Sequence, residues 1–247
     1  MAEPALEAAT PTDAPASNSR PVHVTLHVWA VPRRRVPGAL TRMGRHRGQL
    51  RGAPGVRFAK LLGTGDGRTF TVRDADLRHW ALLVSWSGRD AARTFARSPV
   101  ARSWARIAEE TLQVDLTPLA AKGTWAGGQP FGDPAARSWD GPVAALTRAR
   151  IRPTRAVTFW RSVPAVSADL HRSAGLRLAL GIGEAPVGLQ GTFSLWDSAE
   201  ALRTFAYRQA PHVDAVRRTA EVGWYAEELF ARFAVVGVEG TFRGQRP

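Results

Sequence analysis

One histidine, His212, stands in a context that suits metal or haem chemistry. It follows Pro211 in the stretch Y-R-Q-A-P-H-V-D-A-V (207–216), and proline is favoured in the first turn of a helix. This spacing predicts that His212 lies near a helix start, beside the apolar face of an expected sheet. An imidazole held there can ligate a metal or a haem iron; the alternative is a partly exposed histidine at a helix start. Because the chain has no cysteine, thiolate ligands and disulfides are excluded.

The other five histidines give weaker patterns. His23 and His27 share one face of an expected strand, but no carboxylate stands at a metal-binding spacing from them. No H-E-x-x-H or G-x-S-x-G motif is present, and cofactor-free acid–base chemistry has no specific signature either. Glu227 and Glu228 are explained equally well as surface charges of a helix or as partners of Arg232. The remaining histidines fall in a basic helix, at a strand start and in a loop: His46, His79 and His171.

An internal repeat defines the elements that must position these residues. The segment W-S-G-R-D-A-A-R-T-F-A (86–96) recurs as W-D-S-A-E-A-L-R-T-F-A (196–206), at an offset of 110 residues. Two copies are too few for a solenoid. The repeat therefore predicts a duplicated domain, in which each half can be compared with its twin.

Each copy shows the same order of elements. Strand-like segments at 22–31 and 142–151 are each followed by a proline and about twenty residues with helical spacing. A second strand opens at Gly55 or Gly175, a third covers 79–86 or 189–196, a helix begins near Asp90 or Ser198, and a last strand covers 113–119 or 233–239. This order is the ferredoxin-like βαββαβ unit. We therefore expect an α+β fold in which two antiparallel sheets pack as an intrachain dimeric-α/β-barrel.

The same comparison divides the chain. We expect a disordered tail at 1–20, a first repeat at 21–125, a Gly- and Pro-rich linker at 126–141 and a second repeat at 142–247. The tail lacks the regions of a signal peptide, and no apolar stretch is long enough to span a bilayer. The sequence therefore predicts a soluble, cytoplasmic protein and leaves its oligomeric state open.

Arginine supplies most of the basic charge. The net charge is +13 and Lys60 and Lys122 are the two lysines, so a coding bias towards arginine is one explanation. One cluster on the first expected helix suits phosphates, an anionic membrane surface or a solvated basic face. The other arginines are scattered, and no nucleic-acid partner is expected. The cluster comprises Arg33, Arg34, Arg35, Arg42, Arg45 and Arg47.

The two copies differ in length at two places. The first is ten residues longer between its second and third strands, where G-T-G-D-G (63–67) lacks the ending of a phosphate-binding loop and is expected to be a turn. The second is seven residues longer between Phe205 and Glu227, and His212 lies in that added region without a histidine counterpart. The second difference therefore marks the expected site.

Short motifs in both halves form a recognisable set: G-I-G-E-A-P (181–186), T-F-S-L-W (192–196), F-A-Y-R (205–208) and W-Y-A-E-E-L-F-A-R-F (224–233), and in the first half L-L-G-T-G (61–65). This set resembles the spheroidene monooxygenase family, the carotenoid 2-ketolases. The Pro211-His212 pair and F-W-R-S-V-P (159–164) also fit, so the resemblance covers roughly residues 22 to 243. It implies a haem-containing oxygenase with a dimeric-α/β-barrel fold and an apolar substrate.

The resemblance also implies roles for particular residues. His212 is the expected axial ligand of a haem b iron, and Gln190 and Arg161 are the candidate catalytic residues, although Gln190 suits an exposed strand position equally well. Arginines matched to the haem propionates are Arg148, Arg161 and Arg208. Aromatic residues that line an apolar pocket, or pack in the core, are Trp160, Phe193 and Trp196.

A fold of this kind does not determine the reaction. The leading hypothesis is a haem-dependent monooxygenase acting on a small or apolar organic molecule, with an electron donor as a candidate partner. Three alternatives remain: a haem-dependent dehydratase that converts N–O bonds, a non-catalytic barrel that holds haem or another ligand, and a cofactor-free monooxygenase.

Overall fold

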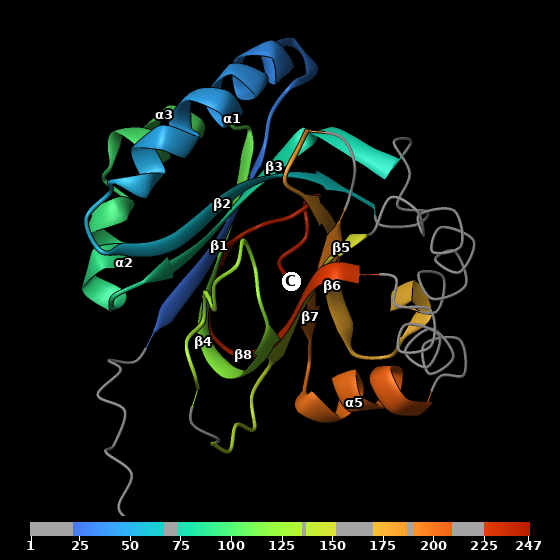
Figure 1. Cartoon of the computed structure of the whole chain (residues 1–247). Helices are drawn as coiled ribbons and strands as arrows, with labels where there is room; N and C mark the ends of the chain where they lie inside the picture. The colour runs from blue at the N-terminus through green and yellow to red at the C-terminus, as the bar shows by residue number, and fades with distance from the viewer. Residues whose placement is uncertain (1–21, 67–73, 135–136, 152–169, 187–189, 209–224) are drawn as a thin grey trace, which may run out of the picture.

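The computed structural model describes residues 22–66, 74–134, 137–151, 170–186, 190–208 and 225–247. Within these residues, eight antiparallel strands form a closed barrel in the order β1-β3-β2-β6-β7-β5-β8-β4 (Figure 1). The strands are β1 (His23–Ala30), β2 (Val56–Gly65), β3 (Ala75–Trp86), β4 (Glu110–Gly123), β5 (Val143–Ile151), β6 (Leu176–Gly183), β7 (Gly191–Trp196) and β8 (Tyr225–Gly240). The helices are η1 (Arg33–Arg35), α1 (Val36–Arg51), α2 (Arg89–Phe95), α3 (Pro99–Ala105) and α5 (Ala199–Arg208).

The barrel consists of two half-barrels with the same strand order. The first sheet is β4-β1-β3-β2 and the second is β8-β5-β7-β6, which is the order of a ferredoxin-like unit. They join where β2 pairs with β6 and where β4 pairs with β8, so each seam joins equivalent strands of the two copies. The predicted duplication and the predicted barrel are both confirmed.

The register of the strands repeats as closely as the sequence does. Trp86 of β3 lies opposite His23 of β1, and Trp196 of β7 lies opposite Val143 of β5. A register shift follows Val56 in β2 and Leu176 in β6, the same position in each copy. Each position of one sheet therefore has a defined twin in the other.

Glycine allows the close approach of β2 and β6. The motifs G-T-G (63–65) and G-I-G (181–183) pair with each other, and a Cβ at Gly63 would collide with the backbone of Ala185 and Pro186. The expectation that G-T-G-D-G is a turn is therefore wrong for Gly63, Thr64 and Gly65, which belong to β2. They extend the strand because β6 and β3 supply partners on both sides.

Two hydrophobic layers flank the barrel and a third cluster fills it. The interior cluster draws residues from all eight strands. A second cluster lies between β1, β2 and β3 and the helices α1, α2 and α3, which lie together on one side of the barrel (Figure 1). A third lies between the second sheet and α5. Among the described residues, no helix is both long and apolar enough to cross a bilayer.

The C-terminal strand differs from the expectation at its start. Glu227 and Glu228 were expected on a helix, but β8 begins at Tyr225 and pairs with β4 on one side and β5 on the other. These two ladders satisfy the backbone hydrogen bonds that a helix would otherwise have formed. As a result, Glu227 shares the inner face of the strand with Leu229 and Ala231.

The segment predicted as a linker also packs into the core. Phe131 is 1% exposed, and its ring contacts that of Phe233 on β8 edge to face, with centroids 4.9 Å apart. An aromatic pair of this kind adds about 0.5–1.5 kcal/mol beyond burial. The connection between the repeats therefore helps to fill one end of the barrel.

Candidate functional site

The outer faces of the two sheets differ sharply in side-chain size. On the first sheet, Trp29 lies opposite Trp80, and His27 opposite Leu82. On the second sheet the twins of these pairs are small or polar. Counting outwards by register from the paired positions, large residues of the first sheet and their twins are Trp29 and Ala149, Trp80 and Gln190, Leu82 and Thr192, Val84 and Ser194, Leu61 and Gly181, and His27 and Thr147.

On the first sheet this volume is filled by protein. Trp29 stacks on Trp104 of α3 with ring centroids 5.1 Å apart, and Trp80 lies 6.1 Å from the same ring. All three indoles are at most 5% exposed, and a buried indole contributes about 150–250 Å² of contact area. At the positions equivalent to Trp29 and Trp80, the second sheet has Ala149 and Gln190 and therefore no indole. Its outer face therefore carries less side-chain bulk of its own than the first sheet does.

Gln190 brings a polar group to this small-residue face. Its backbone N–H donates to Ile182 O at 2.7 Å, and its carbonyl accepts from Ala149 N–H at 2.8 Å. Gln190 therefore continues the β7 ladder by one residue, at the position equivalent to Trp80 on β3. Its side-chain Oε1 is buried and has no hydrogen-bond partner within the described part of the chain. An unsatisfied buried acceptor costs about 1–3 kcal/mol. Gln190 therefore has an acceptor available for a bound molecule.

Arg148 points into the barrel instead. It shares the inner face of β5 with Ala144 and Leu146, is 3% exposed, and pairs with the carboxylates of Glu184 (2.7 Å) and Glu227. The small-residue face lies on the opposite side of the same strand. The expected propionate role is therefore not available to Arg148 for a ligand bound there.

Arg148 and its partners form a partly buried charge cluster at one end of the barrel. Lys60 Nζ lies 2.6 Å from Glu184 Oε2, and the Trp125 indole N–H donates to Glu184 Oε1 at 2.8 Å. Burial opposes ionisation, but the hydrogen bonds from Lys60 and Trp125 hold the pKa of Glu184 below its ordinary value. Both cations also lie over the Trp125 ring, at 5.8 and 5.3 Å. This cluster fastens β2, β5, β6 and β8 together.

Phe193 and Trp196 lie on opposite faces of β7, because they are three residues apart. Phe193 is buried inside the barrel. Trp196 packs outside against Phe205 of α5, with ring centroids 5.3 Å apart, and donates its indole N–H to Ser194 Oγ at 2.9 Å. A single pocket cannot contain both. Other candidates lie outside the described residues: Trp160, Arg161, His212 and the side chain of Arg208.

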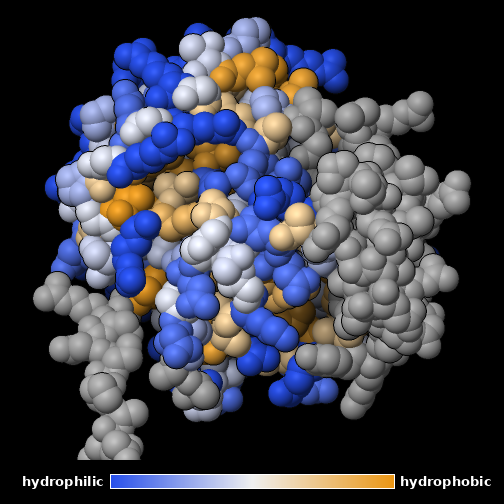
Figure 2. Space-filling view, in the orientation of Figure 1, coloured by the Kyte–Doolittle hydropathy of each residue, from blue (hydrophilic) through white to orange (hydrophobic). Residues whose placement is uncertain are grey.

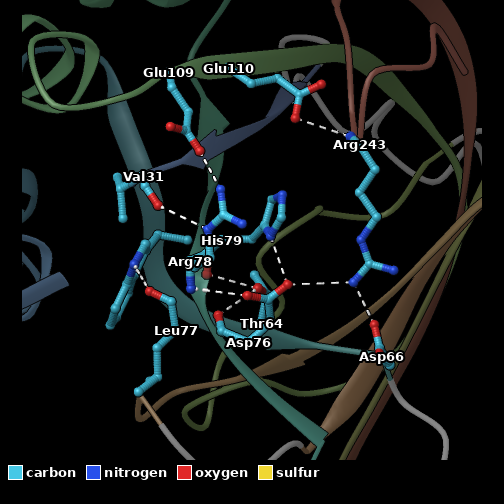
Figure 3. Close-up of polar contacts among 11 residues, drawn as sticks. Val31, Thr64, Asp66, Asp76, Leu77, Arg78, His79, Glu109, Glu110 and Arg243 are labelled. Atoms are coloured by element: carbon cyan, nitrogen blue, oxygen red, sulfur yellow. Dashed lines mark hydrogen bonds and ion pairs between the residues drawn. The ribbon is translucent and has the colours of Figure 1, made fainter. Parts of the chain in front are cut away.

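A cavity of about 530 Å³ lies beside the start of β3 and the start of β4. Its lining includes Asp76, His79, Glu110 and Arg243, which Figure 3 shows. His79 Nδ1 lies 2.7 Å from Asp76 Oδ2, and Arg243 pairs with Asp66 and Asp76. Burial raises the pKa of Asp76, but hydrogen bonds from His79 and the Arg78 backbone, with the charge of Arg243, lower it to about 2. Asp76 is therefore ionised at neutral pH.

The carboxylates around this cavity are already bonded. Glu110 accepts from Gly244 N–H at 2.7 Å, the Thr241 hydroxyl at 2.7 Å and Arg243 N–H at 3.0 Å. In contrast, His79 Nε2 is buried without a partner among the described residues. The Asp76–His79 pair was missed in the sequence because it lies in the longer β2–β3 hairpin, which has no twin. Its i, i+3 spacing was the available signal.

His23 and His27 also have a carboxylate nearby, contrary to the expectation. Asp115 of β4 lies beside β1, with its Oδ1 3.1 Å from His23 Nε2. Burial lowers the pKa of His27 to about 4, against the opposing charge of Asp115. His27 is therefore neutral at physiological pH. Among the described residues, no three His, Cys, Asp or Glu side chains are grouped to hold a metal ion.

Comparison with known proteins gives the family. A spheroidene monooxygenase of Rhodobacter capsulatus is 40% identical over 215 residues, which are 86% of this chain and 89% of that protein. The chain belongs to the spheroidene monooxygenase family. A spheroidene monooxygenase of Rubrivivax gelatinosus is 42% identical over 197 residues, 79% of this chain and 75% of that protein. No protein-family model matches the chain.

Membership of the spheroidene monooxygenase family establishes the class of enzyme. The chain is an oxidoreductase of the monooxygenase type. Its fold is shared with an aldoxime dehydratase solved in complex with butyraldoxime, at a TM-score of 0.58 and 11% identity over 89% of this chain and 81% of that one. A second aldoxime dehydratase structure gives a TM-score of 0.56 at 12% identity over 87% and 81%. At these identities the likeness concerns the barrel fold alone.

Proposed function

We propose that this chain is a haem-dependent monooxygenase and that the haem binds against the outer face of the second sheet. The observation that carries the proposal is the replacement of bulky residues of the first sheet by small residues of the second, as at Trp29 and Ala149. Ala149 and Ser194 are 7% and 6% exposed, so other groups must make up the missing bulk, because protein interiors are close-packed. A flat macrocycle laid against this face would supply that bulk.

The residues present suit such a group. Ala149, Thr192 and Gly181 would place little side-chain bulk between a planar ligand and the backbone of β5, β7 and β6, and Gln190 contributes the unpartnered buried Oε1. We assign the axial ligand to His212 and the propionates to Arg161 and Arg208, with Trp160 beside the macrocycle. Arg148 and Phe193 are left out of the haem site because both face the barrel interior.

Bound haem supplies the iron chemistry by which O₂ is activated. The protein contributes a dry, apolar surface that excludes water and orients the substrate. Gln190 is suited to hold a polar atom of the substrate or of the oxidant by a hydrogen bond. Because the relatives are named for spheroidene, we propose an apolar carotenoid as the substrate and an external electron donor as the partner.

The visible absorption spectrum of the purified chain tests the cofactor. We expect a Soret band, which is lost or shifted in His212→Ala. His171→Ala is the matched control, because His171 is an exposed histidine of the same repeat, and it should leave the spectrum unchanged. An unchanged spectrum in His212→Ala contradicts the ligand assignment. A chain that takes up no haem from medium with adequate iron indicates the cofactor-free alternative.

A second measurement tests the reaction. Oxidation of an added carotenoid should consume O₂ and an electron donor together. Turnover on ferrous haem without consumption of O₂ would indicate a dehydratase. Transfer of haem to an apo-acceptor protein, with no turnover of apolar substrates, would indicate a haem carrier.

A further inference from the structure

The positive charge of the chain is concentrated in one layer. Residues 33–51 and 89–106 contain twelve of the 34 cationic residues and one of the 21 acidic residues, so these 37 residues carry a net charge of +11. The other 210 residues carry 22 cationic and 20 acidic residues, a net charge of +2. A coding bias towards arginine would act along the whole chain. The imbalance therefore belongs to this layer.

The layer, which we call the arginine layer, consists of η1, α1, α2, α3 and the turns that follow α2 and α3. It covers one side of the barrel (Figure 1), and Figure 2 shows hydrophilic residues along it with hydrophobic residues among them. The apolar face of α1 is turned inwards with Met43 and Leu50 buried. Eleven of its twelve arginines are exposed: Arg33, Arg34, Arg35, Arg45, Arg47, Arg51, Arg89, Arg93, Arg97, Arg102 and Arg106.

These charges are not neutralised within the layer. Its single acid, Asp90, lies 3.4 Å from Arg93. Arg42 is hydrogen-bonded to Ser103 O (3.2 Å) and Oγ (3.0 Å), which ties α1 to α3 but cancels no charge. Burial, with the like charges of Arg106 and Arg35, lowers the pKa of Arg42 below its ordinary value. The arginines therefore repel one another and leave a positive field for a partner.

We propose that the arginine layer docks the enzyme on the surface of an anionic phospholipid bilayer. Each exposed guanidinium near a negatively charged leaflet is attracted to the phosphates. Leu40 of α1 is 42% exposed among the arginines and provides an apolar side chain that can enter the interface. The arginines come from η1, α1, α2, α3 and the turns after α2 and α3, so they cover a broad surface rather than one groove.

The choice of a bilayer over a nucleic acid rests on the proposed function, since a carotenoid dissolves in the membrane and not in water. Docking through the first repeat would hold the second repeat close to that store of substrate. An exposed apolar residue among the arginines also favours an acyl boundary over a sugar–phosphate backbone. Nucleic-acid binding is an outcome of the test.

Sedimentation with vesicles free of carotenoid tests docking without any dependence on haem or turnover. We expect the full chain to bind phosphatidylcholine vesicles that contain phosphatidylglycerol, and not pure phosphatidylcholine, at about 0.05 M salt, with binding lost at about 1 M. The triple variant Arg33→Gln, Arg34→Gln, Arg45→Gln should partition roughly a hundredfold more weakly, at about fivefold for each arginine.

The matched control removes three arginines from outside the layer: Arg177→Gln, Arg203→Gln and Arg246→Gln, all exposed. It should bind vesicles as the wild type does, and circular dichroism should show both variants folded. Equal losses in the two variants, no binding of the wild type to anionic vesicles, or preference for duplex DNA over vesicles at the same salt would each overturn the proposal. A chain that binds vesicles but takes up no haem would overturn the proposed function and leave docking intact.

Discussion

Trp80 and Gln190 occupy equivalent positions on the two halves of the barrel, each at the outer face beside the strand that opens its repeat. The indole of Trp80 donates to Leu77 O at 2.9 Å and packs under Trp104. The amide of Gln190 has a buried, unpartnered Oε1. In the first sheet this position is filled by a packed indole, and in the second it carries a buried acceptor without a partner among the described residues.

Refilling the small-residue face should abolish haem binding. Ala149→Trp restores the bulk of Trp29 at the twin position, and we expect haem content to fall at least tenfold because the indole occupies the same volume. Absorbance per mole of protein gives the stoichiometry, and thermal unfolding of the haem-free chain shows whether it folds. Thr192→Leu, the twin of Leu82, is a smaller change of the same kind. Full haem content in both folded variants would rule out this location.

Removing the bulky residue from the first sheet is the control for Ala149→Trp. Trp29→Ala removes a side chain that is 5% exposed and stacked on Trp104. It should lower the free energy of unfolding by about 3–5 kcal/mol, while the folded fraction keeps its haem. Chemical denaturation followed by tryptophan fluorescence measures the loss.

Gln190→Leu should separate stability from function. Removing an unsatisfied buried acceptor should leave the haem-free chain unchanged or stabilise it by about 1–3 kcal/mol, whereas turnover should fall if the amide contacts a bound molecule. The measurements are thermal unfolding and the initial rate. A variant that loses stability and keeps its rate would show that Gln190 is structural.

Breaking the charge cluster around Arg148 should destabilise the barrel. Arg148→Met removes the shared partner of two partly buried carboxylates, Glu184 and Glu227, so the free energy of unfolding should fall by about 3 kcal/mol, the low end for breaking a buried ion pair. Lys60→Met is the milder comparison, at about 1 kcal/mol, because Lys60 is 21% exposed and pairs with Glu184 alone. Denaturant titration of both variants measures the two losses of unfolding free energy. A loss in Lys60→Met equal to or larger than that in Arg148→Met would contradict the central place of Arg148 in the cluster.

Acid should weaken the hairpin end of the barrel through Asp76. Its pKa is lowered from 3.8 to about 2 in the folded chain, so its stabilising contribution is complete above pH 3.8 and is lost as the pH falls towards 2. Because Asp76 is partly exposed and its interactions are screened by solvent, that contribution is on the order of 1 kcal/mol. Unfolding free energies measured across this range should fall more steeply in the wild type than in Asp76→Asn. If the unfolding free energies of the two proteins fell in parallel with pH, the lowered pKa of Asp76 would be contradicted.

The repeat from Trp86 to Ala96, extended to the strands and helices around it, predicted the barrel, because two copies with the same order of elements pair their strands in the same way. The face of a strand was harder to assign. Arg148 was matched to a ligand by residue type, although its even spacing from Leu146 places both on one face. Glu227 alternates with Leu229 and Ala231, which was a strand signal within a segment taken for a helix. Asp115 reaches His23 from another strand, which spacing along one strand cannot show.

The joining of β2 to β6 and of β4 to β8 in a single chain has a consequence for how many sites the barrel can hold. In a dimer of identical single repeats, both sheets have the same sequence. A substitution that removes a bulky side chain from the outer face of one sheet therefore removes it from the other as well. Once the two copies share one chain, each face can diverge alone. One outer face can then stay packed with tryptophan for stability, while the other loses its bulky side chains and becomes free to bind a cofactor. We therefore expect one cofactor per chain and not two.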